Sequence, residues 1–177
     1  MRKILRNIRD LIYDRSGVAA LEMMLSVPLL LAVLLGGVEV TRYILVAQKL
    51  EKVAVTLSDV ATQSETISTS QLDQIIFAAG QVMQPYPFSD DGYVIISSVT
   101  KTGSSNPIVN WQYKGGGSWT QVSQVGLPGM SANLPAGFTL DNQENVIVSE
   151  VFYNFRPMFG SHIFSTNFMI YKTGYFR

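Results

Sequence analysis

The feature that most constrains the fold of this chain is an apolar run from Val18 to Val38 that contains a single charged residue, Glu22. As a helix, about 20 apolar residues span the ~30 Å hydrocarbon core of a bilayer. The run is therefore long enough to cross a membrane. A carboxylate inside such a segment is costly and usually functional. Gly17 stands five residues before it, at the mouth of the run.

The charges at the N-terminus predict the orientation of this segment. Residues 1–17 carry five basic and two acidic side chains, a net charge of +3, and the rest of the chain carries −3. Basic residues stay on the cytoplasmic side of a membrane span, so we expect 1–17 to be a cytoplasmic leader and the C-terminal bulk to lie outside the inner membrane. A cleavable secretory signal has a shorter apolar region, about 7 to 15 residues, followed by a small-residue cleavage site. The sequence has neither.

Beyond residue 38 the pattern changes to an amphipathic one, with an apolar stripe at helical spacing. The stripe consists of Tyr43, Ala47, Leu50, Ala54, Leu57 and Ala61. We expect one helix from about Val18 to Thr62, spanning the membrane to about residue 38 and then continuing as a spine. Its length would be roughly 68 Å at 1.5 Å per residue. A plain signal-anchor helix with a stalk would have the same hydropathy.

Residues 63–177 are predicted to form one exported globular domain of the α+β class. A capping box of Ser70 and Asp73 predicts a second helix over 71–84, ended by Pro85. Runs of β-branched and aromatic residues predict strands, at 93–100, 108–113, 119–125, 145–155 and 162–171. Because the stripe on the spine needs cover, we expect an antiparallel sheet packed on the distal half of the long helix. A hairpin would join the last two strands, and 101–106, 114–118 and 126–140 would be loops.

The composition argues against catalysis and against several classes of ligand. The chain has no cysteine and one histidine, His162, and its acidic pairs lack the spacing of metal ligands. No basic stripe remains in the exported part to neutralise phosphates. The glycine triplet 115–117 lacks the Lys-Ser/Thr ending of a phosphate loop. We therefore predict no enzyme, cofactor, metal or nucleic acid partner.

Three aromatic residues in the predicted strands allow two interpretations. Trp111, Tyr113 and Trp119 could form a sugar-binding platform. Aromatic residues of strands are far more often part of the core. The core interpretation is therefore favoured, and the platform stays as its alternative.

Three local matches make the first quarter of the chain resemble the TadE/TadG-like minor pilins of Tad (Flp, type IVc) pilus systems. They are Arg15-Ser16-Gly17 with Glu22 downstream, the block Val27-Pro28-Leu29-Leu30-Leu31, and Gly37-Val38-Glu39 followed by Arg42. A weaker match lies at 151–157. Val40-Thr41 departs from the family pattern after Glu39. The resemblance implies a minor pilin that supports pilus assembly and surface adhesion.

The resemblance also implies roles for the residues at the mouth of the apolar run. Gly17 would precede the bond cut by a prepilin peptidase, and Val18 would become the new N-terminal residue. Glu22 would then offset the N-terminal amine, its own or a neighbouring subunit's, when helices pack into a filament core. Further implied partners are other Tad pilus subunits, the inner-membrane assembly platform and the membrane itself.

Other residues of the long helix have two interpretations each. Pro28 and the pair Gly36-Gly37 weaken a helix, which indicates either functional kinking or melting, or a kink that membrane helices tolerate. Glu39 and Arg42 are three residues apart and can pair at the membrane boundary, or remain solvated.

Two alternatives to the minor pilin remain open. In one, the chain is a permanently signal-anchored periplasmic binding or scaffold module, and Gly17 and Glu22 coincide by chance. In the other, it is a pseudopilin of a type II secretion system. Processing after Gly17 separates the first alternative from both pilin types.

Overall fold

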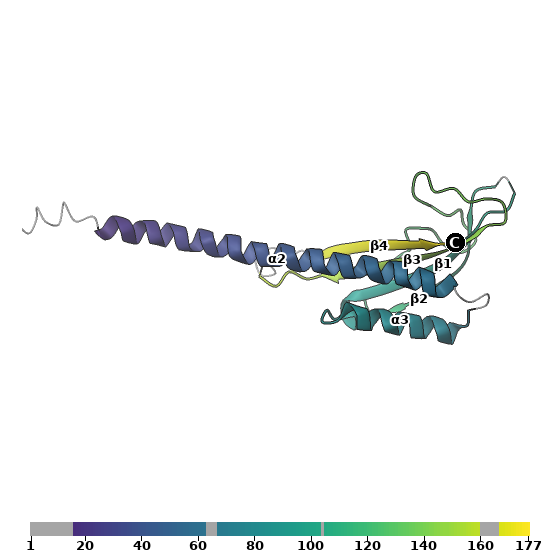
Figure 1. The fold of residues 1–177 in the computed structure, drawn as a ribbon, viewed down its shortest axis with the longest axis horizontal. Coiled ribbons are helices and arrows are strands. Elements are labelled where there is room, and N and C mark those ends of the chain that lie inside the picture. The colour runs from purple at the N-terminus through teal and green to yellow at the C-terminus, as the bar shows by residue number, and fades with distance from the viewer. Residues whose placement is uncertain (1–15, 63–66, 104, 160–166) are drawn as a thin grey trace, which may run out of the picture. The chain divides into compact units, whose positions relative to one another are not determined.

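The computed structural model describes residues 16–62, 67–103, 105–159 and 167–177 (Figure 1). The helices are α2 (Ser16–Thr62), α3 (Thr69–Met83) and α4 (Phe88–Asp91), and the strands are β1 (Gly92–Thr100), β2 (Ile108–Gly116), β3 (Asn145–Phe155) and β4 (Phe168–Phe176). The chain divides into two compact units, one ending at Thr41 and the other Arg42–Arg177, which we call the head. Most of the predicted leader, and His162, lie outside the described residues.

Helix α2 is continuous over 47 residues, as the sequence predicted. In the head, its inner face is buried in a core shared with α3 and the sheet. The buried apolar residues of that face are Val46, Leu50, Val53, Ala54, Leu57 and Ala61. The predicted stripe is thus confirmed from Leu50 onward, whereas Tyr43 is 41% exposed and Ala47 is half-buried.

Helix α3 begins earlier than predicted because Ser68, not Ser70, is its N-cap. The Ser68 hydroxyl accepts a hydrogen bond from the Gln71 backbone, and the Gln71 side chain accepts one from the Ser68 backbone at 2.8 Å. This reciprocal pair satisfies two amide donors at the helix start. Asp73, the predicted partner of Ser70, instead accepts a hydrogen bond from the Tyr113 hydroxyl at 2.6 Å. The helix ends at Met83, just before Pro85, as expected.

The four strands form one antiparallel sheet in the order β2-β1-β3-β4. Three predicted strands are confirmed, and the fourth begins at Phe168 and continues to Phe176. The predicted strand at 119–125 is wrong, because that segment is irregular. The loop predicted at 114–118 is wrong in part, since β2 continues to Gly116. A Cβ on Gly115 would lie 2.9 Å from the Ile76 side chain, so the missing side chain lets α3 pack on β2.

Both α2 and α3 cover the same face of the sheet (Figure 1). Helix α2 contacts β3 and β4 closely at small residues, because the Ser58 and Ser149 hydroxyls hydrogen bond at 2.6 Å. A Cβ on Gly174 of β4 would come within 2.4 Å of the Ala54 carbonyl oxygen. On β2, Tyr113 meets Asp73 of α3. The two helices therefore divide the sheet between them.

The opposite face of the sheet is covered by the long irregular connection between β2 and β3. Side chains of this connection complete a second core, which consists of Val99, Val109, Val125, Leu140, Val146 and Val148. A third cluster joins Tyr93, Ile95 and Phe152, with Trp119 packed against it. The predicted irregular stretch 126–140 thus has a structural role as the cover of this face.

Glu150 fixes the connection to the sheet. Its side chain belongs to β3 and is fully buried. The carboxylate accepts hydrogen bonds from the Ser123 hydroxyl, from the Gln124 and Val125 backbone amides at 2.7 and 3.3 Å, and from the Tyr171 hydroxyl at 3.0 Å. The amides at 124 and 125 are thus bound by a side chain and not by a neighbouring strand. A buried charge is tolerated only with such partners.

We expect Glu150→Ala to lower the free energy of unfolding by about 3 kcal/mol, because several buried donors lose their acceptor at once. The control is Glu51→Ala, since Glu51 is 61% exposed and pairs with Lys172 on the surface. Exposed ion pairs contribute about 0 to 1 kcal/mol. The measurement is urea unfolding of the full chain in detergent, followed by fluorescence of its two tryptophans. Equal losses in the two variants would contradict this role of Glu150.

Candidate assembly site on the N-terminal helix

The residues predicted to be processed lie in the first two turns of α2. Gly17, Val18 and Glu22 are all exposed, and no atom lies within 4 Å of the position that a Gly17 Cβ would take. Val18 and Glu22 are four residues apart, so they lie on the same side of the helix. Along the axis they are separated by about 6 Å. A charge at Val18 and the Glu22 carboxylate would therefore be neighbours.

The helix that follows is apolar on all sides and exposed in this structure. Except for Leu35, which is partly buried, the large apolar side chains of this part of the helix are at least 43% exposed: Val18, Leu21, Met23, Met24, Leu25, Val27, Leu29, Leu30, Leu31, Val33, Leu34, Val38 and Val40. A helix that is apolar all round needs an apolar environment on every side. Among the described residues, α2 is the one helix long and apolar enough to cross a membrane.

The predicted weak points do not interrupt α2. The helix continues through Pro28, which has no backbone N–H and so leaves the Met24 carbonyl without its usual donor. A Cβ on Gly36 or Gly37 would meet open space. The packing of this chain therefore does not require glycine at either position. The Gly37 carbonyl accepts a hydrogen bond from the Thr41 hydroxyl at 2.9 Å. Kinking or melting at these residues stays a prediction.

Arg42 and Tyr43, at the start of the head, both contact the end of β3. The Arg42 guanidinium lies 5.6 Å from the centroid of the Phe155 ring, and the Tyr43 ring packs edge-on against it at 5.5 Å. These are the geometries of a cation–π and an aromatic pair. The two stretches that carry the family resemblance thus meet at Phe155. The proposed Glu39–Arg42 boundary pair stays a prediction.

A buried acid holds the same end of β3. Asp91 accepts from Arg156 at 2.6 Å and from the Asn154 amide at 3.2 Å. Burial raises the pKa of the nearby Tyr153 hydroxyl to about 12, and the charge of Asp91 adds to this shift. The sequence does not predict this cluster, because its three members, Asp91, Asn154 and Arg156, come from α4, β3 and the residue after β3.

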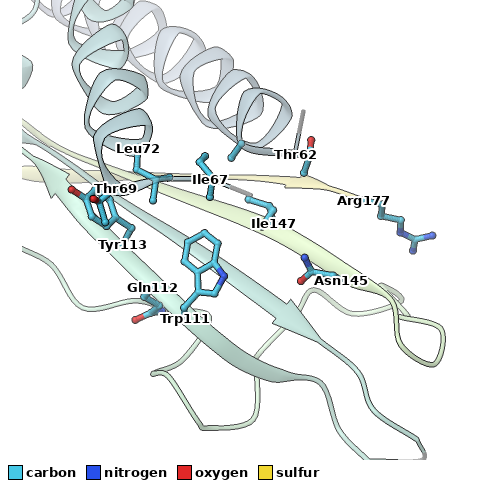
Figure 2. A pocket seen from close by; sticks show the side chains of 11 residues that line it. Thr62, Ile67, Thr69, Leu72, Trp111, Gln112, Tyr113, Asn145, Ile147 and Arg177 are labelled. Atoms are coloured by element: carbon cyan, nitrogen blue, oxygen red, sulfur yellow. The ribbon is translucent and has the colours of Figure 1, made fainter. Parts of the chain in front are cut away.

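The predicted aromatic platform is not formed. Trp111 and Tyr113 line a depression of about 700 Å³ between the end of α2, the start of α3 and the sheet (Figure 2). Trp119 packs on the opposite face of the sheet, against Tyr93, Ile95 and Phe152. The Tyr113 hydroxyl is engaged by Asp73, and this hydrogen bond raises the pKa of Tyr113. Trp111 and Tyr113 also pack on the helix-side core, as the core interpretation predicted.

The described residues contain no cluster of three or more His, Asp or Glu side chains that could hold a metal ion. The charged groups that do meet form structural pairs, such as Arg177 with Glu144 at 3.1 Å.

The architecture defines a class of protein, in which a long N-terminal apolar helix continues into a head of antiparallel sheet and helices. Residues 17–56 match the sequence model of the family described as TadE-like protein. The match begins at Gly17 and includes Glu22, Pro28, both helix glycines and Arg42. No curated protein and no solved structure matches the chain.

The family match confirms the resemblance to TadE-like pilin-type proteins. It suggests a component of a Tad pilus, associated with other pilus components and with a membrane. Proteins of this family have a structural role and are not known as enzymes. The exposed apolar part of α2 fits a single-pass membrane anchor.

The tyrosines of the head predict a loss of stability at alkaline pH. Burial and the charge of Glu150 raise the pKa of Tyr171 above its ordinary value of 10.0, and Tyr153 is raised to about 12. In the unfolded chain both hydroxyls ionise near pH 10. Their stabilising contribution is therefore complete below pH 10 and is lost as the pH rises through the folded-state values.

We expect the free energy of unfolding to fall between pH 10 and about 12, and to fall less steeply in Tyr171→Phe, which cannot ionise there. The measurement is the urea midpoint of both proteins at several pH values in one detergent. At pH 8, where neither tyrosine ionises, the same comparison gives the cost of the lost hydrogen bond to Glu150. An unchanged slope above pH 10 would contradict the assignment to Tyr171.

Proposed function

We propose that this protein is a minor pilin-type subunit of a Tad (type IVc) pilus, made as a precursor and cut by a prepilin peptidase after Gly17. The observation that carries the proposal is that Gly17 and Glu22 occur together, five residues apart, at the N-terminal end of a helix that is apolar all round. The second half of the same helix forms the core of the head. Both residues lie inside the segment that matches the TadE-like family.

The domains have distinct tasks in this proposal. Residues 1–17 are the cytoplasmic leader, 18–62 form the helix, anchored in the inner membrane to about residue 38, and 63–177 form the exported α+β part in the periplasm. The basic leader supports this orientation. After processing, the subunit leaves the membrane for the pilus or the cell surface, where it supports adhesion.

Gly17 suits the position before the scissile bond. A residue without a side chain lets an extended backbone enter a narrow protease cleft. No atom of the described residues lies within 4 Å of the position of a Gly17 Cβ, which supports access of a protease to this position. Cleavage would leave the Val18 amine about one helical turn from Glu22 and on the same side.

Glu22 would favour transfer of the subunit from the membrane to the filament. A charge at the centre of a membrane helix costs about 2.5 to 3.5 kcal/mol on insertion scales, and less near the helix end. Opposite charges attract more strongly in a medium of low dielectric than in water. Pairing with the Val18 amine, its own or that of a neighbouring subunit, would therefore lower the free energy of the packed state.

The remaining predicted residues would tune this packing. Pro28 and the pair Gly36-Gly37 would allow local melting or kinking when helices pack, because both residue types weaken a helix. Glu39 and Arg42 would mark the point where the helix leaves the membrane. The partners are the prepilin peptidase, other Tad subunits and the inner-membrane assembly platform.

The first test is the N-terminal residue of the mature protein. In cells with a prepilin peptidase we expect a chain that begins at Val18, by intact mass and N-terminal sequencing. Cells without the peptidase should retain residues 1–17, and so should Gly17→Phe, because a bulky side chain blocks the cleft. Gly36→Phe, in the same helix, is the matched control and should be cut normally. Retention of Met1 to Gly17 in both strains would overturn the proposal.

The second test separates assembly from processing. Glu22→Gln removes the charge and keeps the shape, so we expect normal cleavage but on the order of tenfold less protein in sheared filaments, the effect of about 1.4 kcal/mol. Glu51→Gln, on the exposed side of α2 in the head, is the matched control. If both variants assembled equally well, the pairing role of Glu22 would be excluded.

A further inference from the structure

Four apolar side chains are exposed together at one end of the head. Met158 and Phe159 follow β3 and are 59% and 44% exposed, while Phe168 and Met169 begin β4 and are 49% and 51% exposed. We call these four residues the hairpin rim. Phe168 pairs with Phe155 and Met169 with Asn154, so β3 ends and β4 begins at the same level.

The direction of β3 along α2 shows which end of the head carries the rim. In the middle of the strand, Ser149 meets Ser58 of α2. At its end, Phe155 meets Arg42 and Tyr43. The strand therefore runs antiparallel to the helix. The rim lies at the end of the head where the chain enters it, at Arg42.

Tyr43, at the same end of the head as the rim, is close in the chain to the apolar segment. Tyr43 follows Val38, the last residue of the apolar run, by five positions. These five steps span about 7.5 Å as a helix and at most about 18 Å if fully extended. The headgroup layer on each side of a bilayer core is itself roughly 5 to 8 Å thick. If the run to Val38 fills the core, Tyr43 lies in or near this layer whatever the angle between the two units.

The composition of this end fits the boundary between lipid headgroups and acyl chains. Phenylalanine and methionine supply apolar surface, and exposed Tyr43, with its polar hydroxyl, is of the type enriched at membrane interfaces. Arg42 and Arg156 provide cationic groups. Arg156 is 61% exposed while it pairs with Asp91, so one face of its guanidinium remains open to an outer ligand.

We propose that the hairpin rim is a membrane-contacting surface that rests on the phospholipid interface while the subunit waits in the bilayer. The inference rests on the proposed membrane anchor and adds a second contact to it. Such a contact would limit the rotation and tilt of the head about α2. It would also have to be released when the subunit leaves the membrane.

The chain offers a clean test because it has no cysteine. Three single-cysteine variants of the full chain, Met169→Cys, Met130→Cys and Leu30→Cys, are labelled with an environment-sensitive fluorophore and reconstituted into phosphatidylcholine–phosphatidylglycerol vesicles. Met130 is the matched control, since it is 58% exposed against 51% for Met169. It lies beside Val109 at the opposite end of the sheet, about 27 Å away along β3.

Lipids that carry a quencher at the headgroup boundary should reduce the fluorescence at position 169 several-fold more than at position 130. Lipids with the quencher deep in the acyl chain should act mainly at position 30. Equal quenching at 169 and 130 would overturn the inference, and so would a blue-shifted but unquenched probe at 169, which would indicate cover by a second copy of the chain. Absence of deep quenching at position 30 would instead overturn the anchor itself.

Discussion

The structure depends on one constraint: both halves of helix α2 carry apolar surface that must be buried, and each half is buried by different partners. In the head, the cover comes from the chain itself, because the sheet and α3 bury one face from Val46 to Ala61. Before Thr41, apolar side chains emerge on every side. A helix of that kind is stable only in lipid or among other helices. The family match at 17–56 includes residues of both halves.

The head is built so that its two faces are held by different kinds of contact. On the helix side, small residues at Ala54, Ser58 and Gly174 bring α2 against the sheet at backbone distance. On the other side, an irregular connection packs on a second core and is bound at its Gln124 and Val125 amides by one buried carboxylate, Glu150. Helices can cover a sheet with their own side chains, whereas a connection without regular structure has free amides that need an acceptor. Glu150 provides that acceptor.

Several side-chain contacts meet at the end of the head near Arg42. Phe155 receives both Arg42 and Tyr43, and Asp91 holds Arg156 immediately after the strand. These contacts lie within the head and hold the first residues of its part of α2 against the end of β3.

The sequence by itself determined the elements that depend on near neighbours. Hydropathy over 18–38 fixed the membrane-length helix, the three-and-four spacing from Leu50 to Ala61 fixed its buried face, and β-branched runs fixed three of the four strands. Only the tertiary structure decided what distant residues do to one another. It placed the cap at Ser68, with Gln71 as its partner, and gave Asp73 to Tyr113. It left 119–125 irregular, with the Gln124 and Val125 amides bound by Glu150. The physical reason is that periodicity records which side of an element is apolar, whereas the partner of a polar group is chosen by the packing of segments far apart in the chain.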